Sequence, residues 1–507
     1  MSALKPRHVL PAVIALALVA AVINQGTTAS GAFQRPKATA GNKTKTSTPA
    51  GSTSTTSTTV PSITTATTVY TPPQSIISST SVPSITTAGT VYTPPSSIAA
   101  DCSTDVAPVL NGWIATVPDG TATNVSVLSF PPNACYEIEE SLYLPRRNWL
   151  DFEGSGTSFK SFTNGRTGPT LLNGQIAPDT DRAAFYADEG THLTWHNLNI
   201  VGSNNCTASP YYNCYNTAYE SQAGFRFSGV TSFTIDSVNV NHVWGDFAEV
   251  DADATNGVGF NRYVTIKNSS GDHFGRHALT CEGCQDSTFT GNSWSTIAYD
   301  GVDMEIECQT YCTSGPDASG RYVGGGEVNV TLANNSFADV GEVWVSISGP
   351  GLVNNVTYSG NQIHGGDGLN FFVSPFSSSS ISTRYSNLYL LNNSADSLFW
   401  SSRGNVELVN VDGATISGNT MPHDNQQGGA CGGHCAYSVD IWGSTSIAVQ
   451  HNTSFYDPYF LQVDGPNAAG GAWTGNTSSG VTNCGNTWGG SGYPNPPTGT
   501  TSDGACS

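Results

Sequence analysis

Residues 330–335 read VTLANN and residues 356–361 read VTYSGN, so each is a short β-rich run that ends in asparagine. Segments of this kind recur along the chain. Consecutive ends lie 24–43 residues apart, within the roughly 20–50-residue periods that indicate a repeat architecture. The segment ends are Asn199, Asn239, Asn268, Asn292, Asn335, Asn361, Asn393, Asn419, Asn452 and Asn476.

The repeat predicts stacked coils made of short strands. Alternation within each segment directs one set of side chains into a narrow core, and equivalent strands of successive coils stack in parallel at about 4.8 Å. An asparagine at a fixed turn tolerates the left-handed backbone conformation, and its amide can bond to the asparagine of the next coil. We therefore predict an all-β fold, a right-handed parallel β-helix solenoid with an asparagine ladder.

The amino-acid composition and the net charge limit the classes of function that the protein can have. Only 11% of the 507 residues are charged and 55 are glycine, which suits short strands and turns. The net charge is −20, from 38 acidic and 18 basic residues. Nucleic acid is excluded as a partner, because phosphate binding needs a basic footprint. A polyanionic substrate would need a local basic patch or bridging metal ions.

The N-terminal region divides the chain into three parts. Lys5 and Arg7 precede an apolar run, Val9–Ile23, so residues 1–32 are predicted to be a signal peptide. The run is shorter than the ~20 residues of a spanning helix, so membrane association is expected only if it is uncleaved. Residues 33–100 are rich in Thr, Ser and Pro, and carry an internal repeat (60–76 and 82–98). They are expected to be a disordered stalk or linker. Residues 101–507 form the β-helix domain of a protein expected to be monomeric and extracellular or at the cell surface.

The twelve cysteines include four close pairs. In an exported chain this favours disulfide-bonded loops. The rival interpretation is a zinc site built from two of the pairs. Spacing leaves the connectivity open, because bonds across adjacent coils suit these positions as well as bonds within each loop. The pairs are Cys206/Cys214, Cys281/Cys284, Cys308/Cys312 and Cys431/Cys435.

Residues 136–159, reading YEIEESLYLPRRNWLDFEGSGTSF, resemble the first coils of pectin-lyase-like β-helices. The resemblance covers roughly residues 135–476 and includes the recurring asparagines. It implies the fold, which hosts lyases, hydrolases, epimerases, tailspikes and adhesins. The polygalacturonase signature of Asn-Thr-Asp, paired Asp and Gly-His-Gly is missing, as are the pectate lyase motifs Trp-x-Asp-His and Arg-x-Pro-x-x-Arg. Activity is therefore not transferred residue by residue.

The resemblance implies that the strand one corner after the asparagine turn carries the binding groove. Aligning that strand from coil to coil directs Val250, Leu279, Met304 and Val345 into the core. The outward positions of consecutive coils then form one acidic patch, which Trp344, Phe372 and Trp442 extend. The outward set is Arg226, Glu249, Asp251, Thr280, Glu282, Asp303 and Glu305.

Polar corners beside these strands complete the candidate site. They place His242, Asp246, Asp272, His273, Arg276, His277 and Asp300 where they overlook the patch. When two carboxylates lie close together, their mutual repulsion raises the pKa of one above that of the other. One can then act as an acid and the other as a base. Inverting glycosidases use a carboxyl pair about 6.5–9.5 Å apart, close to the about 9.6 Å between strands two coils apart. The catalytic candidates are Asp303, Glu305, Glu282, Asp251, Arg276 and His277.

These features favour a secreted carbohydrate-active protein, a polysaccharide hydrolase or lyase, in which Arg276 or a histidine could serve as the base of a lyase or epimerase. No cofactor is required, although the patch could hold Ca²⁺. The alternative is a non-catalytic, surface-displayed or adhesive β-helix in which the acidic patch is a structural cation site or a solvated face.

Overall fold

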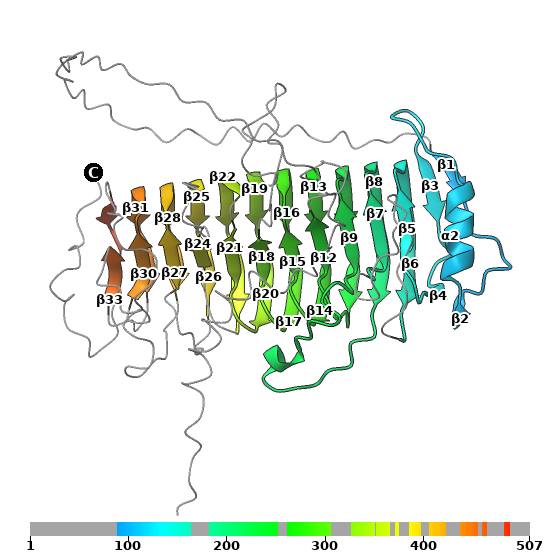
Figure 1. Cartoon of the computed structure of the whole chain (residues 1–507), viewed down its shortest axis with the longest axis horizontal. Helices are drawn as coiled ribbons and strands as arrows, with labels where there is room; N and C mark the ends of the chain where they lie inside the picture. The colour runs from blue at the N-terminus through cyan, green and yellow to red at the C-terminus, as the bar shows by residue number, and fades with distance from the viewer. Residues whose placement is uncertain are drawn as a thin grey trace, which may run out of the picture. The chain divides into compact units, whose positions relative to one another are not determined.

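The computed structural model describes residues 89–163, 182–251, 261–305, 326–349, 351–365, 371–374, 385–396, 405–421, 437–454, 459–463 and 481–486. Over these ranges the chain is a parallel β-helix, confirming the predicted fold. A full coil contributes a strand to each of three columns, and every paired strand runs parallel to its neighbours (Figure 1). None of the helices in the described ranges could cross a bilayer.

The first two columns belong to one 23-stranded sheet, joined where two long strands span both columns. The first column contains β1 (Thr90–Tyr92), β3 (Ser126–Ser129), β6 (Asn148–Lys160), β8 (Thr191–Val201), β10 (Thr231–Asp236), β13 (Asn261–Lys267), β16 (Cys284–Thr290), β19 (Gly326–Ala333), β22 (Leu352–Ser359), β25 (Tyr385–Leu391), β28 (Val411–Ser417), β31 (Thr445–Gln450) and β34 (Thr482–Cys484). The second contains β2 (Asp101–Asp105), β4 (Cys135–Glu137), β11 (Asn239–Asn241), β14 (Ser270–Phe274), β17 (Ser293–Ile297), β20 (Ser336–Val340), β23 (Gln362–His364), β26 (Ser394–Ala395), β29 (Thr420–Met421) and β32 (Thr453–Ser454).

The third column is an 11-stranded sheet that carries the candidate site. Its strands follow one another in chain order from coil to coil. They are β5 (Leu142–Pro145), β7 (Phe185–Asp188), β9 (Phe225–Ser228), β12 (Ala248–Asp251), β15 (Leu279–Cys281), β18 (Val302–Glu305), β21 (Val345–Ser348), β24 (Phe371–Ser374), β27 (Val406–Val409), β30 (Tyr437–Trp442) and β33 (Tyr459–Val463).

Two adjacent residues make the turn between the first and second columns. One has a left-handed backbone, with φ between 51° and 69° in successive coils, and is asparagine, glycine or histidine. The next residue is the ladder asparagine, which is buried. Its side-chain amide donates to the amide oxygen of the next coil's asparagine at 2.9–3.0 Å. The ladder runs through Asn292, Asn335, Asn361, Asn393, Asn419, Asn452 and Asn486.

The predicted asparagine column needs correction at its N-terminal end. Asn268 is the left-handed residue of its coil and is exposed, and Ser269 takes the ladder position, donating its backbone N–H to Asn292. Asn199 and Asn239 pair with each other one position beyond the ladder. Apolar side chains fill the ladder position in those coils. A single asparagine per segment therefore could not distinguish the two neighbouring roles, and Asn476 lies outside the described residues.

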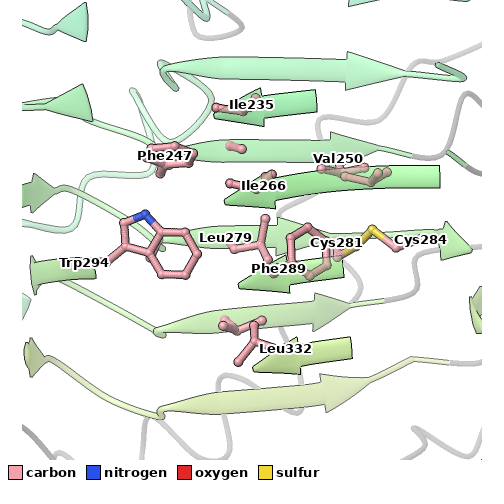
Figure 2. Close-up of a cluster of buried hydrophobic side chains, with 14 of the residues drawn as sticks. Ile235, Phe247, Val250, Ile266, Leu279, Cys281, Cys284, Phe289, Trp294 and Leu332 are labelled. Atoms are coloured by element: carbon pink, nitrogen blue, oxygen red, sulfur yellow. A yellow bond between two sulfur atoms is a disulfide. The ribbon is translucent and has the colours of Figure 1, made fainter. Parts of the chain in front are cut away.

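The core between the sheets is continuous and apolar. Figure 2 shows Val250 and Leu279 of the third column and Ile266 of the first column among the buried side chains of the core, together with Trp294 of the second column. The predicted inward residues Val250, Leu279, Met304 and Val345 are each 0% exposed, so the predicted strand register is correct. Burial of such side chains is the main source of stability in a solenoid, since each coil contacts only its neighbours.

The N-terminal end of the β-helix begins before the expected boundary at residue 101. β1 pairs in parallel with β3, and Tyr92 packs against the core. The β-forming triplet Thr90–Tyr92 thus belongs to the folded unit despite its Thr/Ser/Pro-rich surroundings. Helix α2 (Ala107–Thr116) follows, with Pro in its first turn, and buries Leu110 and Ile114 against the first coils. Residues 1–88 lie outside the described residues.

The cysteines in the described ranges form disulfides. The bonds are Cys102–Cys135, Cys206–Cys214 and Cys281–Cys284, and Cys484 is also disulfide-bonded. The close pairs at 206/214 and 281/284 therefore bond within their own loops, and the zinc alternative fails for Cys281 and Cys284 because their sulfurs are joined. The pairs 308/312 and 431/435 lie outside the described residues.

A buried carboxyl beside the Cys281–Cys284 bond should set part of the pH dependence of stability. Glu327 is fully buried, and its carboxyl accepts the Cys284 N–H. Burial raises the pKa of Glu327 well above its usual value of 4.5. When folding raises the pKa of an acid, its contribution to the stability of the folded state is fully present at pH values below the unfolded-state pKa. This contribution is lost as the pH rises from the unfolded-state pKa to the folded-state pKa.

We therefore expect Glu327→Gln to flatten this loss and to make the domain more stable than the wild type at neutral pH, because the glutamine side chain never has to carry a buried charge. The measurement is urea unfolding between acid and neutral pH. The control for the loss of one carboxyl is Glu137→Gln, at a half-buried position on β4. Parallel profiles for wild type and Glu327→Gln would show that Glu327 carries no such effect.

Candidate functional site

The outward side chains of four consecutive strands come together as predicted. β9, β12, β15 and β18 pair in register, so that Arg226, Glu249, Thr280 and Asp303 form one row across the sheet. Asp251 lies in the next row on β12, and Glu282 follows β15. We call Arg226, Glu249, Asp251, Thr280, Glu282 and Asp303 the acidic face. Glu305 belongs to β18 and pairs with Ser348, and its side chain lies outside what the structure describes.

The side chains of the acidic face are less exposed to solvent than their outward orientation predicts. Glu249, Asp251 and Asp303 are only 4–5% exposed, whereas Glu282 is half-buried. Trp344, expected on this face, instead lies just before β21 and packs in the core against Phe337 and Phe371. It precedes the strand, so the alternation of side chains within the strand does not apply to it.

Two arginines form ion pairs with the carboxylates of the acidic face and its corner. Arg226 Nε lies 2.6 Å from Asp251 Oδ2, and its Nη1 lies 3.8 Å from Glu249. Arg276, at the corner before β15, lies 3.7 Å from the other oxygen of Glu249 and 3.8 Å from Asp246. Glu249 is thus held between two guanidinium groups whose side chains are 17% and 14% exposed.

Asp246 holds an exchangeable proton near neutral pH. Its side chain is fully buried, and this burial, together with the charge of Glu249, raises its pKa to about 7, although Arg276 opposes the shift. Burial alone would lower the pKa of Arg276, but Asp246, Glu249 and Asp303 outweigh it and raise that pKa. The arginine therefore stays charged while Asp246 changes its protonation in the physiological range.

His277 connects Asp246 to the acidic face through a hydroxyl. The Thr280 hydroxyl donates to Asp246 Oδ2 at 2.5 Å, and His277 Nδ1 lies 2.8 Å from the same hydroxyl oxygen. Burial, and the neighbouring Arg276, lower the pKa of His277 well below 6.5, so the ring is neutral. With its one proton on Nδ1, Nε2 carries a lone pair. Asp303 lies 3.8 Å from Nδ1.

Two aromatic rings cover this cluster, one from the corner between β17 and β18 and one from an inserted loop. Tyr299 stacks on His277 at 5.5 Å, and Tyr215 stacks on Tyr299 at 5.0 Å. Tyr215 belongs to the loop 203–222, which contains the short helix η1 (Tyr211–Cys214) and the Cys206–Cys214 bond. Burial raises the pKa of both tyrosines, so both remain neutral hydrogen-bonding groups.

The catalytic candidates omitted four contributors to this cluster. The sequence predicts Asp246 only as a corner residue and Arg226 and Thr280 only as outward residues, and it gives no role to Tyr215. The loop length between β8 and β9 was the available signal, because an insertion at this corner must lie over the adjacent strands. His242, Asp272 and His273 form a separate cluster near the corner of β11 and β14.

A cation site is also compatible with part of the acidic face. One oxygen from each of Glu249, Asp251 and Glu282 lies within 4.8 Å of the others. Oxygen ligands of this kind suit Ca²⁺. However, Arg226 already lies against two of the three carboxylates, so an ion there would compete with a fixed positive charge.

The chain matches no protein-family model and no curated protein. Among solved structures, a family 28 exopolygalacturonase from Yersinia enterocolitica matches over 76% of each chain, with 11% identity and a TM-score of 0.51. An endo-xylogalacturonan hydrolase from Aspergillus tubingensis matches over 82% of this chain and 100% of its own, with 16% identity and a TM-score of 0.44. The Dettilon tailspike protein matches over 78% of this chain and 66% of its own, with 14% identity and a TM-score of 0.44.

The chain is thus a right-handed parallel β-helix protein. It shares this fold with the Yersinia exopolygalacturonase, as the resemblance in the sequence implied.

Proposed function

We propose that the protein is a secreted carbohydrate-active enzyme that cleaves an extracellular polysaccharide at the acidic face. The observation that carries the proposal is the convergence of Glu249, Asp303, Arg276, His277 and Asp246 from three consecutive coils. So many titratable groups are unusual together in a chain with 11% charged residues. Perturbed titratable groups cluster at functional sites.

The geometry suits cleavage of a glycosidic bond. Glu249 and Asp303 are in register on β12 and β18, with Thr280 between them. Strands two coils apart are about 9.6 Å apart, near the separation of the carboxyl pair in inverting hydrolysis. One carboxyl would protonate the leaving oxygen and the other would activate water. The sugar would be positioned by Glu282 and Glu305, on the neighbouring row, and by Asp251, which Arg226 holds in place.

A lyase would use the same groups differently. The lone pair on His277 Nε2 supplies a neutral base for proton abstraction next to a carbonyl. Arg276 would stabilise the negative charge that develops, and the proton would pass from His277 through Thr280 to ionised Asp246. The glycosidic C–O bond would then break, and water would protonate the leaving oxygen. The signal-peptide pattern at the N-terminus and the disulfides support a location outside the cell. A polysaccharide substrate is found there.

A polysaccharide panel tests the proposal directly. The purified protein is incubated with neutral and acidic polysaccharides, with and without chelator, and new reducing ends and unsaturated products are measured separately. We expect one class of polymer to be cleaved, with reducing ends alone for a hydrolase and unsaturated ends for a lyase. The result against the proposal is no cleavage of any polymer combined with a chelator-sensitive loss of stability. That result would favour the second candidate, an adhesive β-helix with a structural cation at Glu249, Asp251 and Glu282.

A further inference from the structure

A pair of histidines stacks at one corner of the β-helix, outside the acidic face. His242 follows β11 and His273 lies near the end of β14, and both have a left-handed backbone, with φ of 56° and 58°. Because β11 and β14 are in register, these left-handed positions lie one above the other. The two imidazole rings are 4.5 Å apart and nearly parallel, at 27°.

A carboxylate completes a set of metal-ligand types at this corner. Asp272 precedes His273 on β14, and its Oδ2 lies 3.1 Å from His273 Nδ1. One nitrogen of each ring and one oxygen of Asp272 all lie within 4.8 Å of one another. Two imidazoles and one carboxylate are the donors of Zn²⁺ sites with an open position and of related first-row metal sites. Ca²⁺ and Mg²⁺ prefer sets made of oxygen atoms alone.

The backbone around His242 fixes which ring nitrogen can bind a metal. His242 Nδ1 lies 3.2 Å from the backbone carbonyl oxygen of Asn204. A carbonyl oxygen only accepts, so Nδ1 must carry the proton and Nε2 of the neutral ring carries the lone pair. Metal-binding histidines usually donate their second ring N–H to a carbonyl or carboxylate in this way, which orients the ring and raises the basicity of the ligating nitrogen.

The corner is also rigidly built. Asn204 is buried, accepts the Cys206 N–H through its side chain and donates to Val243 O and to the Tyr211 hydroxyl. Tyr211 packs edge-on against His273 at 5.6 Å. The Cys206–Cys214 bond closes the loop that carries both Asn204 and Tyr211. Ligands held by such surroundings need only small side-chain rotations to reach the roughly 3.3 Å separations that tetrahedral zinc requires.

We propose that His242, Asp272 and His273 form a binding site for a divalent transition metal, with zinc as the probe. The two histidines and the aspartate supply three ligands, and solvent or another small donor supplies the fourth. A metal here ties the coil corner to the loop 203–222, because the loop's Asn204 orients one ligand and its Tyr211 packs on another. The same loop carries Tyr215 over the acidic face, so the metal stabilises the cover of the candidate active site.

Zinc titration of the whole secreted protein by calorimetry tests the proposal. We expect one site of micromolar or tighter affinity and a rise in Tm with zinc but not with Mg²⁺. His242→Asn and His273→Asn should each weaken zinc binding at least about tenfold. Asparagine is the chosen replacement because it tolerates the left-handed backbone, so the fold should be retained. Asp272→Asn, which keeps the shape and removes the charge, should also weaken binding.

The matched control is His451→Asn, a histidine at another left-handed turn position with φ of 52°. It should bind zinc as the wild type does. Glu282→Gln separates this site from the acidic face and should likewise leave the zinc titration unchanged. Wild-type zinc affinity in both His242→Asn and His273→Asn overturns the proposal, as does a titration abolished by Glu282→Gln alone. Circular dichroism confirms that each variant is folded before it is titrated.

Discussion

Asp303→Asn is expected to lower turnover on the cleaved polysaccharide by about two to four orders of magnitude, the usual range for loss of an acid–base group. Asp303 is 5% exposed on the outer side of β18 and lies 3.8 Å from His277. Asparagine keeps its shape and removes only its ability to carry charge or a proton. Thermal stability should stay nearly unchanged, because the core residues Val302 and Met304 on the same strand are untouched. Initial rates at saturating substrate, together with thermal unfolding, measure the two effects.

A matched control for this variant is Asp286→Asn. Asp286 lies 2.7 Å from Arg262, but it belongs to the 23-stranded sheet and not to the acidic face. It should leave turnover unchanged. If Asp303→Asn and Glu282→Gln both retain full activity on a polysaccharide that the wild type cleaves, the acidic face is not the active site.

Asn393→Ala is expected to destabilise the β-helix by about 3–6 kcal/mol, a large part of the net stability of a folded domain. The Asn393 side chain accepts from both the backbone N–H and the side-chain amide of Asn361, and donates to Tyr358 O and Asn419. Alanine leaves the backbone N–H and one side-chain N–H of Asn361 buried without their acceptor, and it removes one hydrogen bond to the Tyr358 carbonyl. Each such group costs about 1–3 kcal/mol. Urea unfolding followed by far-UV circular dichroism measures the change.

The neighbouring residue supplies the control. Asn392 is exposed and has a φ of 55°, a conformation that glycine adopts freely. Glycine already occupies the equivalent position at Gly360 and Gly418. Asn392→Gly should therefore change stability by no more than about 0.5 kcal/mol. Equal losses in Asn392→Gly and Asn393→Ala would mean that the turn, and not the ladder, carries the stability.

The fold was predictable because its signal is repeated and local. Pairs such as Gly360–Asn361 and Asn392–Asn393 place a left-handed residue before a ladder asparagine in coil after coil. Strand alternation then directed Val250 and Met304 inward correctly. Asn268 was assigned to the wrong one of the two turn positions, because Ser269 replaces the ladder residue that would have marked the register.

The sequence predicts which side chains share the outward face, but not the environment around them. Residues that share a strand face, such as Glu249 and Asp251, follow from alternation. Their burial depends on the loop 203–222 and on ion pairs with Arg226 and Arg276, which involve contacts between distant parts of the chain. The raised pKa of Asp246 has the same origin, since burial is its main cause. The local sequence pattern does not indicate which corner of the β-helix a long insertion covers.

The asparagine ladder has an electrostatic direction. From Asn292 to Asn452 every side-chain amide oxygen accepts from the preceding coil, and one N–H of each amide donates to the asparagine of the following coil. The other N–H donates to a backbone carbonyl of the preceding coil. The amide dipoles are therefore aligned head to tail along the stack, and each hydrogen bond polarises the next. The negative end meets the backbone N–H of Ser269. The positive end is neutralised within the chain, because the Asn486 amide donates to Asn483 Oδ1 at 2.7 Å and to Cys484 O at 3.1 Å.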